Sequence, residues 1–236
     1  MIKAILFDLD GTLLPMDQNI FVKTYFGGLA KKLALRGYEP QQLINSVWTG
    51  VKAMIKNDGE KLNEQIFWDV FENIYGKKVK SDMKYFEEYY EQDFDKVQEV
   101  CGYNEKAKQV MNTVKQLGFR TALATNPIFP AIATKKRIFW AGLDYTDYEL
   151  ITTYENSRFC KPNLEYYKDV IKELNVLPEE CVMVGNDVSE DMVASKLGLK
   201  VFLLTDCLIN KDNVDISAFP NGSYDQLIDY VISLNR

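Results

Sequence analysis

A short apolar run near the start of the chain, residues 4–7, shows no alternation between apolar and polar positions. Such a run is typical of a strand that is buried on both faces inside a parallel sheet. Asp8 and Asp10 follow it two residues apart, so an extended backbone points both side chains to the same side, and Gly11 then allows a sharp turn. Carboxylates are costly to desolvate at the end of a buried strand unless a cation or hydrogen bonds compensate. The pattern therefore favours a metal or catalytic site over the alternative, a solvated turn built from common turn residues.

The pattern becomes helical after Pro15 and stays helical up to about Val100. Apolar residues recur there every three or four positions, which lines up one face of each of several helices. Gly37 and Gly76 are placed to end two of them. We therefore expect an all-helical subdomain over residues 15–100, inserted directly after the first strand. Four of its aromatic residues fit either a substrate cleft or a helical core, and their helical spacing favours the core: Trp48, Trp68, Tyr89 and Tyr90.

Helical and strand patterns alternate from Glu105 onward, which is the signature of repeated βαβ units and of a parallel sheet. Further strands are expected at residues 119–124, near 148–152, at 181–184 and at 201–204. Between them lie amphipathic helices, one of which Asn163 is well placed to cap. Residues 1–14 and 101–236 are therefore expected to form one α/β core domain, with helices on both faces of the sheet.

Composition and charge mainly exclude classes of function. The 236 residues are 47% hydrophobic, which is enough for a sizeable core. The net charge is -6 and no tract is rich in Lys or Arg, so we expect no nucleic-acid partner. The first strand begins next to the initiator Met, which leaves no room for a secretion signal, and no apolar run approaches membrane-spanning length. We expect a cytoplasmic protein without a membrane partner, as a monomer or homodimer.

The chain has no histidine, and its four cysteines lie far apart. Catalytic triads that use histidine, zinc sites and a small disulfide framework are therefore disfavoured. Acid–base chemistry in this protein must use carboxylates, lysine, tyrosine or cysteine.

Polar residues follow three of the predicted strands and occupy one loop: Asp8 with Asp10, Thr125 with Asn126, Asp187 with Asp191, and Lys161 in the loop. Because right-handed crossovers bring the carboxyl ends of parallel strands to one edge of the sheet, these side chains can converge there. Carboxylates without histidine or cysteine suit a hard cation such as Mg²⁺. A hydroxyl and a lysine beside them would bind a phosphate group.

In this order, the residues resemble the four motifs of the haloacid dehalogenase superfamily of phosphatases and phosphotransferases. The similar segments are Asp-Leu-Asp-Gly-Thr at 8–12, Thr-Asn at 125–126, Lys-Pro at 161–162 and the acidic segment at 185–191. The resemblance covers the whole chain, because that family inserts its helical cap between the first and second motifs. It implies a Rossmann-like parallel sheet with an inserted helical cap subdomain.

The resemblance also implies a role for each site residue. Asp8 would be the nucleophile that forms an aspartyl-phosphate, and Asp10 would protonate the leaving oxygen and later deprotonate a water molecule. Thr125 and Asn126 would bind the phosphoryl group. Lys161 would neutralise its developing charge and hold the nucleophile.

For the metal, the resemblance implies Mg²⁺ between Asp8, the main-chain carbonyl of Asp10 and Asp187, with Asp191 in support. The ion would let an anionic carboxylate approach an anionic phosphate. The fourth motif commonly reads Gly-Asp, whereas Asn186 intervenes here; in the other register Asn186 takes the ligand position and metal binding weakens. Asp191 has two equally good explanations: it is a metal ligand, or it is an acidic residue in the first turn of a helix, where the helix dipole favours negative charge.

The expected function is a Mg²⁺-dependent phosphatase acting on a small phosphorylated metabolite, with the cap closing over the site. The nearest alternative is a phosphotransferase or mutase resembling β-phosphoglucomutase, which would protect the aspartyl-phosphate from water. A non-catalytic scaffold of the same fold is a third possibility, which only Asn186 favours. A dehalogenase is disfavoured, because dehalogenases of the superfamily lack an acid at the position of Asp10. A receiver-type signalling module is disfavoured as well, because such modules are single small domains with a different order of motifs.

Overall fold

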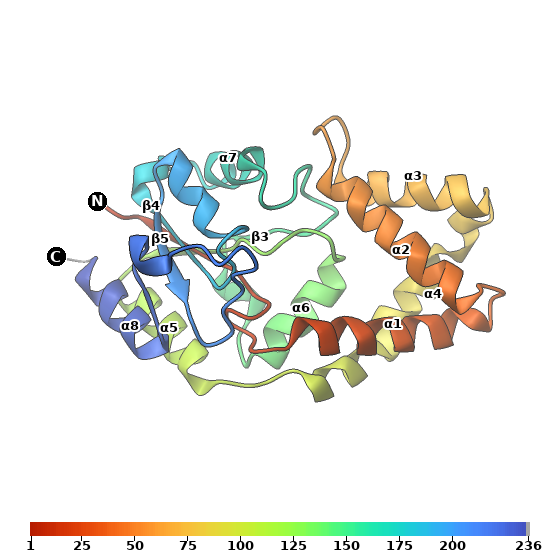
Figure 1. The fold of residues 1–236 in the computed structure, drawn as a ribbon, viewed down its shortest axis with the longest axis horizontal. Coiled ribbons are helices and arrows are strands. Elements are labelled where there is room, and N and C mark those ends of the chain that lie inside the picture. Colours follow the sequence, from red (N-terminus) through yellow and green to blue (C-terminus); the bar gives the residue numbers. More distant parts are fainter. Residues whose placement is uncertain (235–236) are drawn as a thin grey trace.

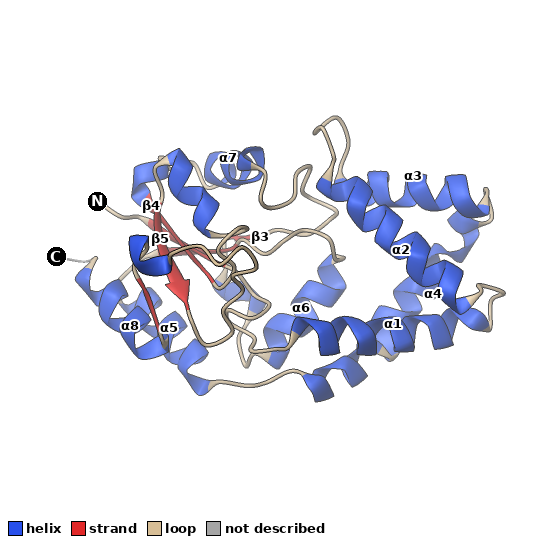
Figure 2. Cartoon of the chain, in the orientation of Figure 1, coloured by secondary structure: helices blue, strands red, loops and turns tan. Residues whose placement is uncertain are grey.

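The computed structural model describes residues 1–234, and a six-stranded parallel sheet lies at its centre (Figure 2). The strand order is β3-β2-β1-β4-β5-β6. The strands are β1 (Ala4–Phe7), β2 (Arg120–Leu123), β3 (Leu150–Ile151), β4 (Cys181–Gly185), β5 (Lys200–Leu204) and β6 (Asn221–Gly222). The predicted strands are confirmed, and β6 was missed because a two-residue strand is too short to produce a pattern.

The register places the end of β1 in the middle of one edge of the sheet. Phe7 is paired with Leu123 of β2 on one side and with Val184 of β4 on the other. The segments that follow these three strands therefore start at the same level, at the carboxyl edge where open α/β sheets bind ligands. All four residues of β1 are buried, as expected for a strand covered on both faces.

Helices cover both faces of the sheet, which confirms the predicted fold class. On one face, α5 (Glu105–Gln116) and α8 (Tyr224–Ser233) share a core with Phe7 and Val184. On the other, α7 (Leu164–Glu173) shares a core with Leu6 and Met183. Successive strand residues thus face opposite sides. The remaining elements of this part are α6 (Ala131–Trp140) and the 3₁₀ helices η2 (Tyr145–Asp147), η3 (Pro178–Glu180), η4 (Met192–Leu197) and η5 (Ile216–Ala218).

The helical segment between β1 and α5 lies on the side of the molecule opposite the two termini (Figure 1). It contains α1 (Gln18–Ala34), α2 (Pro40–Ile55), α3 (Asn63–Tyr75), α4 (Val79–Gln92) and the 3₁₀ helix η1 (Phe94–Val100). Its two connections to the sheet run side by side, because Met16 pairs with Cys101 and the amide of Gly102 donates to the carbonyl of Pro15 over 2.7 Å. The exact subdomain boundaries at 15 and 100 stay a prediction. Within residues 1–234, no helix combines the length and apolarity needed to cross a membrane.

Of the four aromatic residues predicted to form the helical core, one lies fully within it and two pack against it. Tyr89 is fully buried. Trp68 and Tyr90 are partly buried and pack against this core, but they also line a cavity. Trp48 lines the same cavity and is 41% exposed. Helical spacing shows which residues share a face, but it cannot show whether the facing surfaces meet or leave a space.

Candidate active site

A buried lysine joins two carboxylates at the carboxyl edge of the sheet. Nζ of Lys161 lies 2.9 Å from Oδ1 of Asp8 and 2.6 Å from Oδ1 of Asp191. Lys161 is only 1% exposed. Burial by itself would lower the pKa of Lys161, but the charges of Asp191 and Asp8 outweigh it and hold that pKa well above its ordinary value. The lysine therefore stays charged and fixes the orientation of the Asp8 carboxylate.

Asp191 is held over the end of β4 by two contacts. Besides its ion pair with Lys161, its Oδ2 accepts a hydrogen bond of 3.0 Å from the amide of Asp187. The close approach requires glycine at position 185, because a Cβ on Gly185 would lie 2.1 Å from the Asp191 carboxyl carbon. Asp191 therefore positions the lysine, a role that neither of the two sequence-based explanations included.

Thr12 and Asn186 connect the first motif to the fourth. The hydroxyl of Thr12 lies 3.1 Å from Oδ2 of Asp8 and 3.0 Å from Oδ1 of Asn186, and its single proton serves one acceptor at a time. Nδ2 of Asn186 donates to the carbonyl of Cys207 over 2.7 Å. Gly11 has a φ of 88°, and a Cβ there would lie 2.3 Å from Nδ2 of Asn186. The Asn186 side chain thus packs against the turn and has partners for both polar atoms.

One oxygen of Asp187 is used by the turn that follows β4. Its Oδ1 accepts from the amide and the hydroxyl of Ser189 over 2.8 and 2.7 Å, and from the amide of Glu190 over 3.0 Å. Its other oxygen accepts no hydrogen bond from any residue in the described part of the chain. Asp187 is therefore anchored at one oxygen and available to a ligand at the other.

The predicted phosphate-binding pair follows β2. The carbonyl of Thr125 accepts from the hydroxyls of Tyr166 over 2.9 Å and Thr152 over 2.7 Å, while the Thr125 hydroxyl has no partner among residues 1–234. Nδ2 of Asn126 donates to Glu190 over 3.0 Å. Burial raises the pKa of that glutamate to about 6. The Thr125 hydroxyl is free for a phosphoryl oxygen, whereas Asn126 would have to exchange its glutamate partner to bind one.

Asp10 is paired with an arginine that no sequence motif indicated. Arg137, on α6, is fully buried, and its guanidinium donates to Oδ2 of Asp10 and, over 3.3 Å, to the hydroxyl of Thr134. Burial raises the pKa of Asp10, the charge of Arg137 opposes this shift and the charge of Asp8 adds to it. The sequence contained a signal for this pair, because Arg137 lies next to Ile138 and shares the buried, apolar face of its helix. A charged residue on such a face calls for a buried partner.

We expect Arg137→Lys to lower the free energy of unfolding by about 1–2 kcal/mol, because lysine loses the additional donors to Thr134 and to the Ala133 carbonyl. Urea denaturation monitored by circular dichroism measures the change. The matched control is Arg120→Lys, whose ion pair with Glu149 is on the surface and should cost less than about 1 kcal/mol. If both variants lost the same free energy of unfolding, the buried ion pair would contribute no more to stability than the surface pair, which would contradict this prediction.

The oxygen atoms at this edge fit a magnesium ion. Within residues 1–234 no group of three or more Asp, Glu, Cys or His side chains is placed to hold a metal by itself. Mg²⁺ commonly binds through only one or two carboxylates, with waters and a substrate phosphate completing its shell. Asp8 and the free oxygen of Asp187 can supply these carboxylates. In addition, Oδ1 of Asp10 and Oδ1 of Asn126 are buried acceptors without a partner in the described chain, so a cation or proton donor would satisfy this edge.

Comparisons with known proteins agree with the motifs and the sheet. The family of haloacid dehalogenase-like hydrolases matches residues 2–198. YhcW of Bacillus subtilis, which carries a provisional phosphatase name, is 26% identical over 210 residues, covering 86% of this chain and 84% of its own. The phosphoglycolate phosphatase of Colwellia psychrerythraea is 26% identical over 196 residues, or 82% and 80% of the two chains. The crystal structure of a HAD phosphatase from Thermococcus onnurineus superposes with a TM-score of 0.57 at 17% identity, covering 99% of this chain and 98% of that one. Since the family match extends over most of the sequence and the fold agrees with it, the chain belongs to the haloacid dehalogenase-like hydrolases.

Proposed function

We propose that this protein is a phosphatase that hydrolyses a small phosphorylated metabolite through an aspartyl-phosphate on Asp8. The observation that carries the proposal is the carboxylate of Asp8, which Lys161 and Thr12 hold at the carboxyl end of the central strand. The phosphatase names of the two relatives described above support it. A nucleophile with fixed orientation is what phosphoryl transfer most requires.

Each of these side chains has a part in the proposed reaction. An Asp8 oxygen attacks phosphorus, and the P–O bond to the leaving group breaks. Lys161 keeps Asp8 oriented and compensates the charge on the phosphoryl oxygens, to one of which the Thr125 hydroxyl donates. Asp10 holds Arg137 at Oδ2, so its partnerless Oδ1 is the atom from which a proton would pass to the leaving oxygen. The raised pKa of Asp10 favours this protonated form. Water then hydrolyses the intermediate, with Asp10 accepting its proton.

Mg²⁺ would be held by Asp8, the main-chain carbonyl of Asp10 and the free oxygen of Asp187, with Asp191 contributing through Lys161 rather than as a ligand. When bound, the ion supplies positive charge that reduces the repulsion between the carboxylate and the phosphate. Asn186 already has partners for both polar atoms, which supports Asp187 as the ligand in this register.

The helical segment would act as a cap that restricts the site to small substrates and excludes water, with its paired connections at Met16 and Cys101 serving as a hinge. The cytoplasmic location and the monomeric or homodimeric state stay predictions.

The test is a screen of phosphorylated metabolites for release of inorganic phosphate, with Mg²⁺ and with a chelator. We expect hydrolysis that the chelator abolishes and added Mg²⁺ restores. Hydrolysis that chelation leaves unchanged would overturn the mechanism. Transfer of phosphate between substrate hydroxyls faster than its release would identify a mutase instead, and no turnover of any substrate would favour a binding scaffold.

We expect Asp187→Asn to raise the Mg²⁺ concentration needed for half-maximal activity by at least roughly 10-fold, since even partners outside the ligand shell matter by 10- to 100-fold. Activity measured over a Mg²⁺ titration tests this. Asn186→Ala is the comparison, because it removes the bonds to Thr12 and Cys207 but no charge, and it should leave the Mg²⁺ requirement nearly unchanged. A larger shift for Asn186→Ala would reverse the assignment of the ligand.

A further inference from the structure

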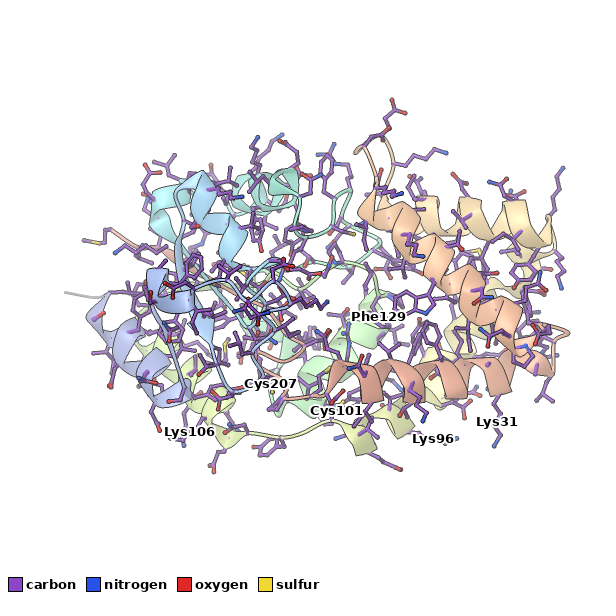
Figure 3. The ribbon with its side chains drawn as sticks, viewed as in Figure 1. Lys31, Lys96, Cys101, Lys106, Phe129 and Cys207 are labelled. Carbon is purple, nitrogen blue, oxygen red and sulfur yellow. The ribbon has the colours of Figure 1, made fainter. Side chains whose placement is uncertain are left out.

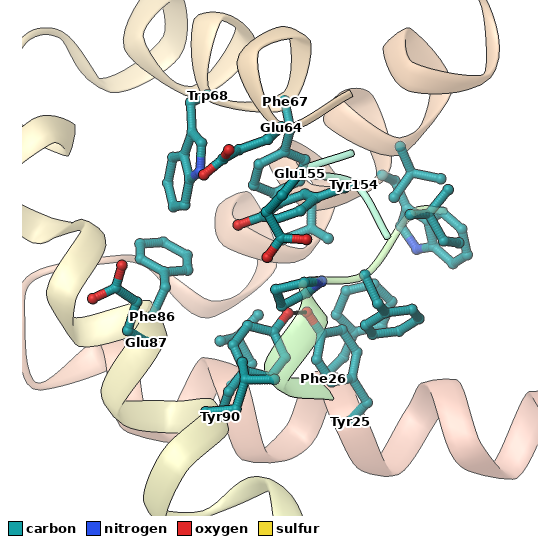
Figure 4. A pocket seen from close by; sticks show the side chains of 18 of the residues that line it. Tyr25, Phe26, Glu64, Phe67, Trp68, Phe86, Glu87, Tyr90, Tyr154 and Glu155 are labelled. Carbon is teal, nitrogen blue, oxygen red and sulfur yellow. Dashed lines mark hydrogen bonds between the residues drawn. The ribbon is translucent and has the colours of Figure 1, made fainter. Parts of the chain in front are cut away.

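An aromatic cavity of about 340 Å³ lies where the helical segment meets the loops that follow β2 and β3 (Figure 4). Its walls include an aromatic residue from each of the four α-helices of that segment and from both loops: Tyr25, Trp48, Trp68, Tyr90, Phe129 and Tyr154. The volume is that of a small-molecule site.

All charged residues that line this cavity are glutamates. Glu64, Glu87 and Glu155 are seen among the aromatic rings in Figure 4, and Glu91 completes the set. Glu155 accepts from the amide of Ala131 at the start of α6 over 2.8 Å. Glu64 and Glu87 form no ion pair with any Lys or Arg in residues 1–234. The cavity therefore contains carboxyl groups that no basic side chain among residues 1–234 pairs with.

Two properties of the cavity select the same kind of ligand. The faces of aromatic rings carry negative electrostatic potential and attract cations, and the glutamates add full charges. Burial raises the pKa of Glu64, and the charges of Glu155 and Glu87 add to that shift, so these carboxylates repel each other. An anionic group would be repelled here. A metal ion prefers a shell of oxygen atoms to ring faces, whereas an organic ammonium group suits both parts of the wall.

A buried donor in the wall is a further indication of a ligand. The indole Nε1 of Trp68 is buried near the Tyr154 hydroxyl, but no acceptor in the described part of the chain meets the distance and angle of a hydrogen bond. Buried donors without partners are uncommon and costly. A hydroxyl or ester oxygen next to the ammonium group would satisfy it.

One wall of the cavity packs against a residue of the candidate active site. Phe129 lines the cavity, and its ring centroid lies 4.4 Å from the guanidinium carbon of Arg137, which is paired with Asp10. Figure 3 shows Phe129 between the sheet and the helical segment. The loop that contains Phe129 begins at the predicted phosphate-binding residues Thr125 and Asn126. The cavity thus adjoins the ion pair that contains Asp10, the residue proposed above to protonate the leaving oxygen.

We propose that this cavity binds an amine or quaternary ammonium group in the leaving-group part of the substrate. This inference rests on the proposed phosphatase function for its position in the reaction, but the binding itself does not depend on catalysis. The substrate class is a phosphate ester of an amino alcohol or a related organic cation.

Binding is tested on the full chain by tryptophan fluorescence, because Trp48 and Trp68 line the cavity. The probes are choline and 3,3-dimethylbutan-1-ol, a neutral molecule of nearly the same shape. We expect saturable quenching by choline and at least roughly 10-fold weaker binding of the neutral alcohol, given the strength of buried cation–π and charge contacts. Equal binding of both, or no saturable binding of choline, would overturn the proposal.

Variants locate the binding. Glu64→Gln and Glu87→Gln should each weaken choline binding by roughly 5- to 10-fold, because each removes a charge from the wall. The matched control is Glu88→Gln, next to Glu87 on α4 but outside the cavity lining, which should leave choline binding unchanged. The same loss in Glu88→Gln would show a general charge effect and contradict the site.

Hydrolysis distinguishes this inference from the proposed function. The wild type should hydrolyse phosphocholine with a kcat/KM at least roughly 10-fold above that for 3,3-dimethylbutyl phosphate. Glu64→Gln should lower that ratio, whereas the control Glu88→Gln should change neither the ratio nor kcat for methyl phosphate. Activity on other esters without choline binding would refute the cavity assignment and leave the phosphatase intact. Choline binding that depends on Glu64, without turnover of any ester, would refute the phosphatase and keep the cation site. Choline binding without a preference for phosphocholine would remove the cavity from the substrate path.

Discussion

Asp8→Asn should abolish phosphate release, with kcat lowered by about 10⁴-fold or more, because the amide cannot attack phosphorus and nucleophile removal in other enzymes costs this much. The structure gives a reason to expect a folded variant, since asparagine can keep an oxygen within reach of Lys161 or Thr12. The measurement is inorganic phosphate release on the best substrate of the screen, together with thermal unfolding to verify folding.

The covalent step can be observed directly. Wild-type protein quenched in acid during turnover of a ³²P-labelled substrate should carry label that hydroxylamine releases, as an acyl phosphate does, and Asp8→Asn should carry none. Asp212→Asn, on an exposed loop, is the control of equal charge change and should keep both label and activity. A folded Asp8→Asn variant with more than about a hundredth of wild-type activity would exclude Asp8 as the nucleophile.

Lys161→Met should lower the free energy of unfolding by about 3–5 kcal/mol, the typical cost when one partner of a buried ion pair is removed. The physical reason is that Asp8 and Asp191 would both remain buried without a counter-charge. Urea denaturation gives the value, with coincident transitions by fluorescence and circular dichroism as the test of two-state behaviour. Activity should be lost as well.

A second substitution separates charge from packing in this variant. Adding Asp191→Asn to Lys161→Met removes one of the two unpaired carboxylates and should recover about half of the lost stability without restoring activity. The surface control is Lys168→Met, whose pair with Glu165 is about half exposed and should contribute less than about 1 kcal/mol. Equal losses for Lys161→Met and Lys168→Met would show that the buried lysine does not neutralise this site.

The sequence was sufficient for the fold and for most of the residues at the sheet edge. Buried strands of a parallel sheet produce uninterrupted apolar runs, and the polar residues that end them are conspicuous for that reason. Asp8, Lys161 and Asp191 do meet in the structure, as expected from parallel strands that share a carboxyl edge. The sequence pattern located strand β3 only approximately and did not indicate strand β6. Each has two residues, which are too few to show a periodicity.

The partners of individual side chains were beyond the sequence. Arg137 lies 127 residues from Asp10 along the chain, and Asn126 lies 64 residues from Glu190. No spacing rule connects positions so far apart. Asp191 has a position in the sequence that fits a metal ligand or the first turn of a helix, and only its distances to Lys161 and to the Asp187 amide show that it orients the lysine.

What the sequence by itself determined, then, is the order of strands and helices, the edge at which Asp8 lies and the chemistry that an oxygen-only, histidine-free site can support. These follow from local physics, namely periodicity, desolvation and the chemical nature of side chains. Only the tertiary structure decided that Arg137 pairs with Asp10 and that Trp68 and Tyr90, which pack against the core, also line a cavity. Such features depend on how closely the surfaces of distant segments approach each other. The periodicity of a single helix or strand carries no information on this, because it is the same whether a neighbouring surface touches the element or leaves a space beside it.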